Sequence, residues 1–261
     1  MSVDEKRFER ALESEFAEKM RKRQREKAVK VLDFRNRYGL DVKSGRGKLG
    51  NAIRDLRYLL DQGYPRDSAV NFVSNHYRFP LDQRHLLARC VFSKSEIREH
   101  CRKAVGANSV RGKRLGIDGY NVLITLESIM TGKQVVRCDD GYVRDLRAIF
   151  GKYRTTPATT RAISMLIQTI TKAKPKDVTV LFDKQVSHSG ELAAEVRQQL
   201  KQAGLNGNAL AVGEVDRKLL KFDVVASSDR AVIKRAKAIW DIPSELLKRK
   251  KADIIDLAKM T

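Results

Sequence analysis

The stretch Arg114-Leu-Gly-Ile-Asp-Gly-Tyr-Asn-Val-Leu123 decides how this chain folds. It holds a short apolar run that ends in Asp118 and is followed by a segment with helical character. Two later apolar or β-branched runs repeat the pattern and end in Asp183 and Asp229. Such runs, separated by helical segments, are typical of buried strands in a parallel sheet. We therefore predict a doubly wound α/β domain over residues 109–261.

The expected strands and helices of this domain alternate along the chain. Strands are expected at 115–117, 178–182, 209–212 and 224–227. Helices are expected from Tyr120, over 142–153 and 160–173, from about Ser187 to Gly204, over 230–240 and from Ser244 onward, with a helical turn at Asp216. Alternation of this kind indicates a parallel sheet with helices packed against it.

Acidic residues follow several of the expected strands. In a parallel sheet the residues after each strand collect at one edge, so Asp118, Asp183 and Asp229 should converge there. Asp216 follows another apolar run and can reach the same edge. Clustered carboxylates repel one another, and a divalent cation such as Mg²⁺ or Mn²⁺ is their natural partner. Asp140 is a further candidate ligand, with a helix N-cap as the equally weighted alternative.

The overall charge indicates the kind of partner. The chain has 261 residues and a formal net charge of +21, which favours a polyanion, with nucleic acid preferred over an acidic membrane surface. No apolar run approaches the length of about 18 residues that a membrane span needs. The N-terminus lacks the apolar core of a secretory signal, and the three cysteines show no CxxC spacing. We expect a cytoplasmic protein with reduced cysteines.

Residues 1–43 are predicted to form a basic helical arm. Neither Pro nor Gly occurs from Asp4 to about Tyr38, and apolar residues recur at i+4, as in one long helix. Its second half carries a dense run of Lys and Arg. A solvated helix face and an RNA-facing surface explain such a run equally well. The candidate RNA contacts in this arm are Lys22, Arg23 and Arg25.

Residues 44–108 are predicted to form a compact helical domain. Gly63 and the pair Phe79-Pro80 interrupt its helices, and Ser93 with Glu96 has the spacing of a capping box. Arginines decorate these helices, and arginine binds phosphate bidentately and stacks on bases. The candidate nucleic-acid contacts of this region are Arg46, Lys48, Arg54, Arg57 and Arg84.

Three motifs carry a resemblance to a known family. Ile117-Asp-Gly-Tyr-Asn-Val122, Val180-Leu-Phe-Asp183 and Val225-Ala-Ser-Ser-Asp-Arg230 resemble the signature strands of PIN-like nucleases, especially the NYN branch. The resemblance covers roughly residues 113 to 245. The N-terminal half resembles a helical domain of unknown function that is fused to such domains in uncharacterised archaeal proteins.

The resemblance implies a PIN-like fold and a metal-dependent endoribonuclease. Its metal ligands would be Asp118, Asp183, Asp216 and Asp229. Asn121 and Ser228 would position the site. The substrate would be structured RNA, with the ribosome, ribosomal RNA or transfer RNA as candidate partners. Family members often pair, so a homodimer is the expected assembly.

One departure from the family pattern keeps a second hypothesis open. The family usually has two adjacent acids where this chain has Val215-Asp216-Arg217, so the alternative is an RNA- or ribosome-binding factor without turnover. A phosphatase of the haloacid dehalogenase type is disfavoured, because it needs a second Asp where this chain has Tyr120. A catalytic pair of Ser187 and His188 is also disfavoured, since adjacent side chains rarely face each other.

Overall fold

A computed structural model of the protein describes residues 47–146, 153–250 and 254–257. The predicted basic arm with Lys22, Arg23 and Arg25 lies outside these ranges, as does Arg46. The chain divides into two compact units, Met1–Ile53 and Arg54–Thr261. The features described below lie in the second unit, apart from residues 48–53.

Four consecutive helices confirm the predicted helical region. They are α2 (Lys48–Asp61), α3 (Arg66–His76), α4 (Leu81–Cys90) and α5 (Lys94–Lys103). Gly63 follows α2 with φ +84°, a conformation that glycine adopts without strain. The capping box at α5 forms as predicted: Ser93 Oγ accepts from Glu96 N at 3.2 Å, and Glu96 Oε2 accepts from Ser93 N at 3.1 Å.

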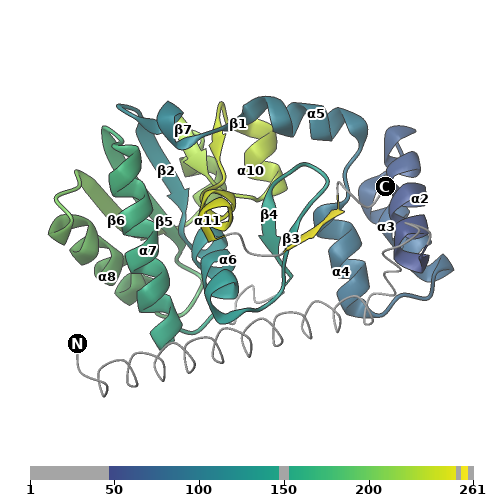
Figure 1. The fold of residues 1–261 in the computed structure, drawn as a ribbon, viewed down its shortest axis with the longest axis horizontal. Helices are drawn as coiled ribbons and strands as arrows, with labels where there is room; N and C mark the ends of the chain where they lie inside the picture. The colour runs from purple at the N-terminus through teal and green to yellow at the C-terminus, as the bar shows by residue number, and fades with distance from the viewer. Residues whose placement is uncertain (1–46, 147–152, 251–253, 258–261) are drawn as a thin grey trace, which may run out of the picture. The chain divides into compact units, whose positions relative to one another are not determined.

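Six parallel strands form the main sheet in the order β1-β8-β7-β2-β5-β6 (Figure 1). They are β1 (Ala104–Val105), β2 (Arg114–Asp118), β5 (Asp177–Asp183), β6 (Gly207–Val212), β7 (Val224–Ala226) and β8 (Ile239–Trp240). β2 lies between β5 and β7, with Asp118 in register with Leu181 and Ile117 with Ala226. A parallel sheet in the C-terminal half is therefore confirmed.

Helices cover both faces of this sheet because side chains alternate along each strand. Val180 and Phe182 belong to one core cluster, whereas Leu181 between them belongs to another. The first cluster receives α6 (Gly119–Thr131), α7 (Pro157–Ala173), α8 (Ser189–Gln202) and α11 (Ile242–Lys250). The second receives α9 (Val215–Leu219) and α10 (Arg230–Arg235). A short 3₁₀ turn, Ala107–Val110, leads into β2.

A second, smaller sheet corrects the start of the predicted helix over 142–153, of which residues 147–152 lie outside the described ranges. β3 (Val135–Arg137) and β4 (Val143–Asp145) form an antiparallel hairpin, and β9 (Ile255–Asp256) pairs with β3 in parallel. Gly141 has φ +84° in the hairpin turn, and its N–H donates to the Cys138 carbonyl at 2.9 Å. The acidic pair before it therefore belongs to a turn and not to a helix start.

The predicted helix over 230–240 is also wrong in its second half. α10 ends at Arg235, and Ile239–Trp240 forms β8, which pairs with β1 and β7. Both β8 residues are buried. In the described ranges we find no helix that is both long and apolar enough to cross a bilayer.

Contacts within the second unit join its helices to the α/β part. Glu96 of α5 accepts from Arg66 of α3 at 3.3 Å and from Arg230 of α10 at 2.7 Å. Hydrogen bonds to Arg230 and Ser93 and the charge of Arg66 lower the pKa of Glu96 to about 2, although burial opposes this. This carboxylate therefore stays ionised while it joins three helices.

Candidate functional site

Three of the predicted acids lie at the carboxyl ends of adjacent strands. Asp118 ends β2, Asp183 ends β5, and Asp229 follows β7. Because β5, β2 and β7 are neighbours in the sheet, the three residues lie along one edge, as predicted. Asp216 lies in the first turn of α9, after β6, at the same edge.

Ser227 connects Asp118 to Asp229. Its Oγ donates to Asp118 Oδ2 at 3.0 Å and accepts from Asp229 N at 3.1 Å. Asp118 also caps α6, accepting from Asn121 N at 3.3 Å. Ser227 was expected only as one of the polar residues near the acids, and its position between β7 and Asp229 is the sequence signal for this contact.

Asn121 and Ser228 form the predicted positioning pair. Asn121 Oδ1 accepts from Ser228 N at 2.8 Å and from Ser228 Oγ at 2.9 Å. This double contact fixes the loop after β7 against the start of α6. The two segments that carry Asp118 and Asp229 are thus held together by side chains and by the sheet.

The four acids act on one another electrostatically. Burial raises the pKa of Asp118 to about 7, and the charges of Asp229 and Asp216 add to this effect while two hydrogen bonds oppose it. The pKa of Asp216 is also raised, by burial first and then by the charges of Asp229 and Asp183, although Arg235 counteracts it. These four carboxyl groups therefore share one electrostatic neighbourhood.

No basic side chain of the described residues forms an ion pair with these four acids. Asp183 instead accepts from Gln185 N at 2.9 Å, and Asp229 caps α10 by accepting from Ala231 N at 2.7 Å. Within residues 47–146, 153–250 and 254–257, no three His, Cys, Asp or Glu side chains form a ready metal centre. The arrangement is a loose acidic cluster.

Asp140, the fifth predicted ligand, has a different set of partners. Both of its oxygens accept from Arg144 at 2.7 Å, and His100 Nδ1 lies 2.8 Å from Oδ2. The charge of Arg144 holds the pKa of Asp140 below its usual value, although burial opposes this. The structure does not bring Asp140 into the acidic cluster, and no helix follows for it to cap.

Arg144 extends this buried network to the loop after β7. Its side chain is 3% exposed, and its Nε donates to the Ser228 carbonyl oxygen at 2.8 Å. The guanidinium also lies 4.9 Å from the centre of the Phe92 ring. The residue that neutralises Asp140 thus also fixes the backbone beside Asp229, a role that sequence reasoning missed.

The predicted nucleic-acid contacts have mixed environments. Arg57 binds Asp139 at 2.8 Å, and Arg84 Nε donates to the Phe79 carbonyl at 2.9 Å. Both therefore make contacts that stabilise the protein itself. Lys48 and Arg54 have exposed side chains on α2.

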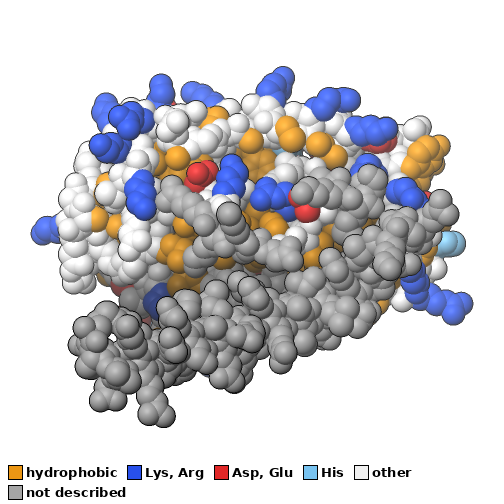
Figure 2. Space-filling view, viewed as in Figure 1, with side chains coloured by type: hydrophobic (Ala, Val, Ile, Leu, Met, Phe, Trp, Pro, Cys, Tyr) orange, Lys and Arg blue, Asp and Glu red, His pale blue; other side chains and the backbone are white. Residues whose placement is uncertain are grey.

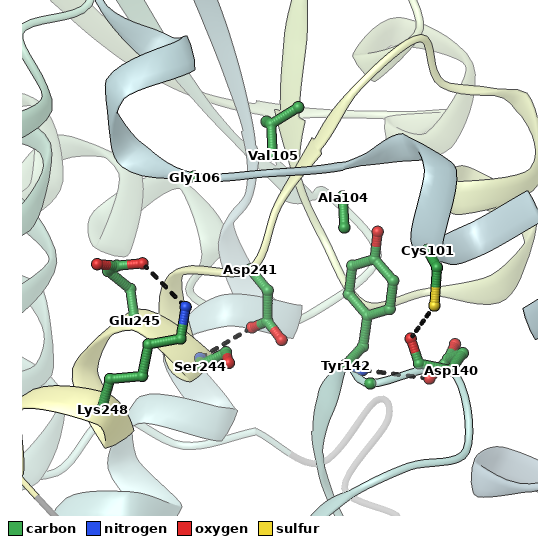
Figure 3. Close-up of a pocket in the computed structure, with 11 residues that line it drawn as sticks. Cys101, Ala104, Val105, Gly106, Asp140, Tyr142, Asp241, Ser244, Glu245 and Lys248 are labelled. Carbon is green, nitrogen blue, oxygen red and sulfur yellow. Dashed lines mark hydrogen bonds and ion pairs between the residues drawn. The ribbon is translucent and has the colours of Figure 1, made fainter. Parts of the chain in front are cut away.

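Another acid at the same edge was missed. Asp241 follows β8 and accepts from Val143 N at 2.9 Å and from Ser244 N at 3.0 Å. Burial raises its pKa to about 6. It lies in a cavity of about 350 Å³ together with Tyr142 and Lys248 (Figure 3). The predicted helix over 230–240 concealed the strand that places it there.

Two family comparisons match most of the described chain. A domain of unknown function, DUF5616, matches residues 107–245. The chain belongs to the DUF5616 family. A second match, to a protein family of unknown function, DUF434, covers residues 48–103.

This DUF5616 protein has an archaeal relative. This chain is 37% identical over 198 residues to the uncharacterized protein MJ0935 of Methanocaldococcus jannaschii. The match covers 75% of this chain and 95% of that protein. No solved structure matches. The matches confirm an N-terminal segment of unknown function and an uncharacterised archaeal relative, as predicted, whereas the PIN-like identity of the C-terminal segment stays a prediction.

Proposed function

We propose that this DUF5616 protein is a PIN-like, metal-dependent endoribonuclease. The observation that carries the proposal is the set of acids at one sheet edge, none of which forms an ion pair with a described Lys or Arg although the chain has a net charge of +21. An acidic cluster in a basic protein is expected to bind a cation, because a divalent ion relieves the repulsion among its carboxylates. The PIN-like motifs at these strand ends support the same proposal.

The donor set fits Mg²⁺ or Mn²⁺ in chemical type. Mg²⁺ keeps several waters and is commonly bound through one or two carboxylates together with substrate phosphates, so a ready group of three acids is not required. Asp118 and Asp229, joined through Ser227, are the proposed direct ligands. Asp183 and Asp216 would complete the site through bound waters.

Each residue of the cluster has a defined part in this proposal. A bound divalent cation lowers the pKa of a water and neutralises charge on the phosphate. Ser227 orients Asp118 Oδ2, and Asn121 keeps the Ser228 backbone in place. Because its pKa is about 7, Asp118 is half protonated near neutral pH without a cation, and it must release that proton to act as a ligand.

RNA is the proposed substrate because of the charge distribution. Lys and Arg side chains are scattered over the face shown in Figure 2, where acidic side chains appear at only a few points. Contacts between Lys or Arg side chains and RNA phosphates supply binding affinity that does not depend on the nucleotide sequence. The ribosome, ribosomal RNA and transfer RNA are candidate partners, and the cytoplasmic location and homodimer stay predictions.

The decisive experiment is a cleavage assay on total RNA with Mn²⁺. The double variant Asp118→Asn/Asp229→Asn should lose cleavage and keep its affinity for RNA. Asp223→Asn is the matched control, because Asp223 lies at the opposite end of β7 and binds Arg114 at 3.1 Å. Equal cleavage by the wild type and the double variant would exclude the nuclease proposal.

Two observations favour a second function. The first turn of α9 contains one acid, Asp216, where PIN-like nucleases usually have two, and no three His, Cys, Asp or Glu side chains of the described residues form a ready metal centre. These features favour an RNA- or ribosome-binding factor without turnover. Wild-type protein that retains RNA in the Mn²⁺ assay without producing fragments would support this function.

A further inference from the structure

The loops that lead into the strands lie at the opposite edge of the main sheet from the acidic cluster, because its strands are parallel. Three of these loops lead into β2, β5 and β7, and we call their joint surface the amino edge: residues 111–114, 174–177 and 221–223. Backbone hydrogen bonds join them. Lys176 N donates to the Lys113 carbonyl at 2.9 Å, and Asp223 N donates to the Arg114 carbonyl at 3.1 Å. The three loops therefore form one continuous surface.

This surface is strongly basic. Its loops contain four exposed lysines: Lys113, Lys174, Lys176 and Lys221. In the ranges that the structure describes, none of the four forms an ion pair. The loops contain two acids, and one of them, Asp223, already pairs with Arg114 at 3.1 Å. Asp177 is thus the one acid left in these loops to balance four lysines, and the amino edge carries a net positive charge.

The crossover helices bring further cations to the same edge. Each of these helices returns from the end of one strand to the start of another, so its last turn lies at the amino edge. The last turns of α7, α8 and α10 contain exposed basic residues: Lys172, Lys201, Lys234 and Arg235. Cations in a last turn are favourable to the helix macrodipole, which offsets part of their mutual repulsion. Figure 2 shows Lys and Arg side chains along the upper margin of the view, where β2 begins in Figure 1.

Lys174 has a backbone conformation that usually belongs to glycine. It caps α7 with φ +53°, in the left-handed region, whereas α6 ends on Gly132 in the same region. A side chain is unfavourable there because its Cβ crowds the backbone. The position is fixed on both sides, since Lys174 N donates to the Ile170 carbonyl at 3.1 Å and Gly112 N donates to the Lys174 carbonyl at 3.0 Å. A lysine at a position that favours glycine indicates a role for its charge outside folding.

The chemistry of the amino edge fits the phosphate backbone of a nucleic acid and not its bases. Lysine binds phosphate as a point charge. The one aromatic residue in the three loops, Phe222, packs against the core, so these loops offer no surface on which a base could stack. Sites for single strands commonly use such aromatic surfaces. Double-helical RNA instead presents its phosphates outward in a fixed arrangement and is recognised largely through its backbone and shape.

We propose that the amino edge binds the phosphate backbone of a double-helical RNA segment. The proposal takes RNA as the partner from the proposed function and adds a second contact surface. The seven residues of β5 separate the two sheet edges by about 20 Å, at roughly 3.3 Å per residue. An RNA helix can therefore occupy the amino edge while the acidic cluster stays accessible. An RNA that reaches both edges has to extend around the domain, which fits a large folded RNA.

Equilibrium binding in EDTA tests this proposal without cleavage. The probes are a blunt, fluorescein-labelled RNA duplex and a single strand of the same length. The triple variant Lys113→Gln/Lys176→Gln/Lys221→Gln should weaken duplex binding at least about tenfold. The slope of log affinity against log salt should become shallower by roughly 2–3, because each lost phosphate contact removes about 0.9. The loss should be larger for the duplex than for the single strand, and the reverse order would overturn the assignment to a helix.

A matched triple variant controls for the loss of net charge. Lys133→Gln/Arg161→Gln/Arg197→Gln removes three charges from exposed positions outside the amino edge: before β3, in the first turns of α7 and within α8. This control should keep the wild-type salt slope. Equal losses of duplex affinity in the two triple variants, or none in the first, would overturn the proposal.

Lys174→Gly separates binding from stability. Its melting temperature should be at least that of the wild type, since glycine adopts the left-handed conformation without strain, while duplex binding weakens by about fivefold through one lost contact. Wild-type duplex affinity in this variant would overturn the role of Lys174. Vesicles of phosphatidylcholine and phosphatidylserine are a further probe. If the first triple variant loses vesicle binding and keeps duplex affinity, the amino edge binds an anionic membrane and the RNA proposal is wrong.

The two proposals fail in different assays. If the wild type cleaves RNA in Mn²⁺ and the first triple variant binds the duplex normally, the nuclease stands and the amino edge is rejected as an RNA surface. If that variant loses duplex affinity and the wild type does not cleave RNA, the amino edge stands as part of a binding factor and the nuclease is rejected.

Discussion

Asp118 links the stability of the fold to pH through its raised pKa. Its pKa is about 7 in the folded protein against an ordinary value of 3.8, so the folded state holds the proton more tightly than the unfolded state. The free energy of unfolding should therefore fall as pH rises from about 4 to about 7. Asp118→Asn should remove this slope, which a shift of this size places at about 4 kcal/mol between those pH values.

Urea unfolding at several pH values measures this effect. Asp223→Asn serves as the control, because Arg114 lowers the pKa of Asp223 to about 2 and its contribution has the opposite sign. A pH slope in Asp118→Asn that equals the wild-type slope would contradict the assigned environment of Asp118.

Gly119 is required by packing and not by backbone conformation. A Cβ at this position would overlap the Phe182 ring, which belongs to the core above β5. Gly119→Ala should therefore lower the free energy of unfolding by about 1–3 kcal/mol, the usual effect of overpacking. Gly190→Ala is the matched control, since a Cβ there meets no atom within 4 Å. Thermal melting distinguishes the two, and equal melting temperatures would exclude the clash.

Sequence patterns predict some site residues and miss others for a physical reason. Asp118, Asp183 and Asp229 could be predicted, since each comes directly after a buried run that defines a strand. Arg144 could not, because its bond to the Ser228 carbonyl joins residues 84 positions apart and involves a backbone atom. Ser227 likewise depends on the direction of one hydroxyl group.

At the scale of the secondary-structure elements, the β3–β4 hairpin contacts the loop that carries Asp229 through Arg144. Arg144 in β4 binds Asp140 through two nitrogens and Ser228 through the third. A lysine presents its three N–H donors from a single nitrogen and cannot span both Asp140 oxygens and the Ser228 carbonyl as the planar guanidinium does. Arg144→Lys should lower the free energy of unfolding by about 3 kcal/mol and, in the folded fraction, reduce Mn²⁺-dependent cleavage.

The control for this variant is an arginine that pairs with the same hairpin. Arg89 of α4 pairs with Asp145 of β4 at 3.6 Å. Arg89→Lys should therefore destabilise the protein less and leave cleavage per folded molecule unchanged. Cleavage per folded molecule that is normal in Arg144→Lys would show that Arg144 serves stability alone.

Long elements were predicted more successfully than short ones. α7 and α8 have 17 and 14 residues, enough to display a helical period, and β5 has seven. β1, β8 and β9 have two residues each, too few for any period to be visible. Their pairing partners are distant in the sequence, so only tertiary contacts identify them as strands.

At the scale of the whole molecule, charge should determine how RNA affinity responds to salt. The logarithm of affinity falls with the logarithm of salt concentration, with a slope set by the number of phosphates that basic residues neutralise. Deleting residues 1–43 should make this slope shallower if the predicted arm contacts phosphate. Binding titrations at several KCl concentrations give the slope, and the same slope in both proteins would exclude the arm from the RNA contact.

The ion pairs around the hairpin limit how this protein can be dissected. A fragment cut between the DUF434 and DUF5616 matches would lack Arg57 and His100, so Asp139 would lose its cationic partner and Asp140 one of its two. Arg230 would also lose Glu96. Trimming at the family boundary should therefore destabilise the DUF5616 segment, and a genome encoding that segment without the first would have to replace these partners with new ones.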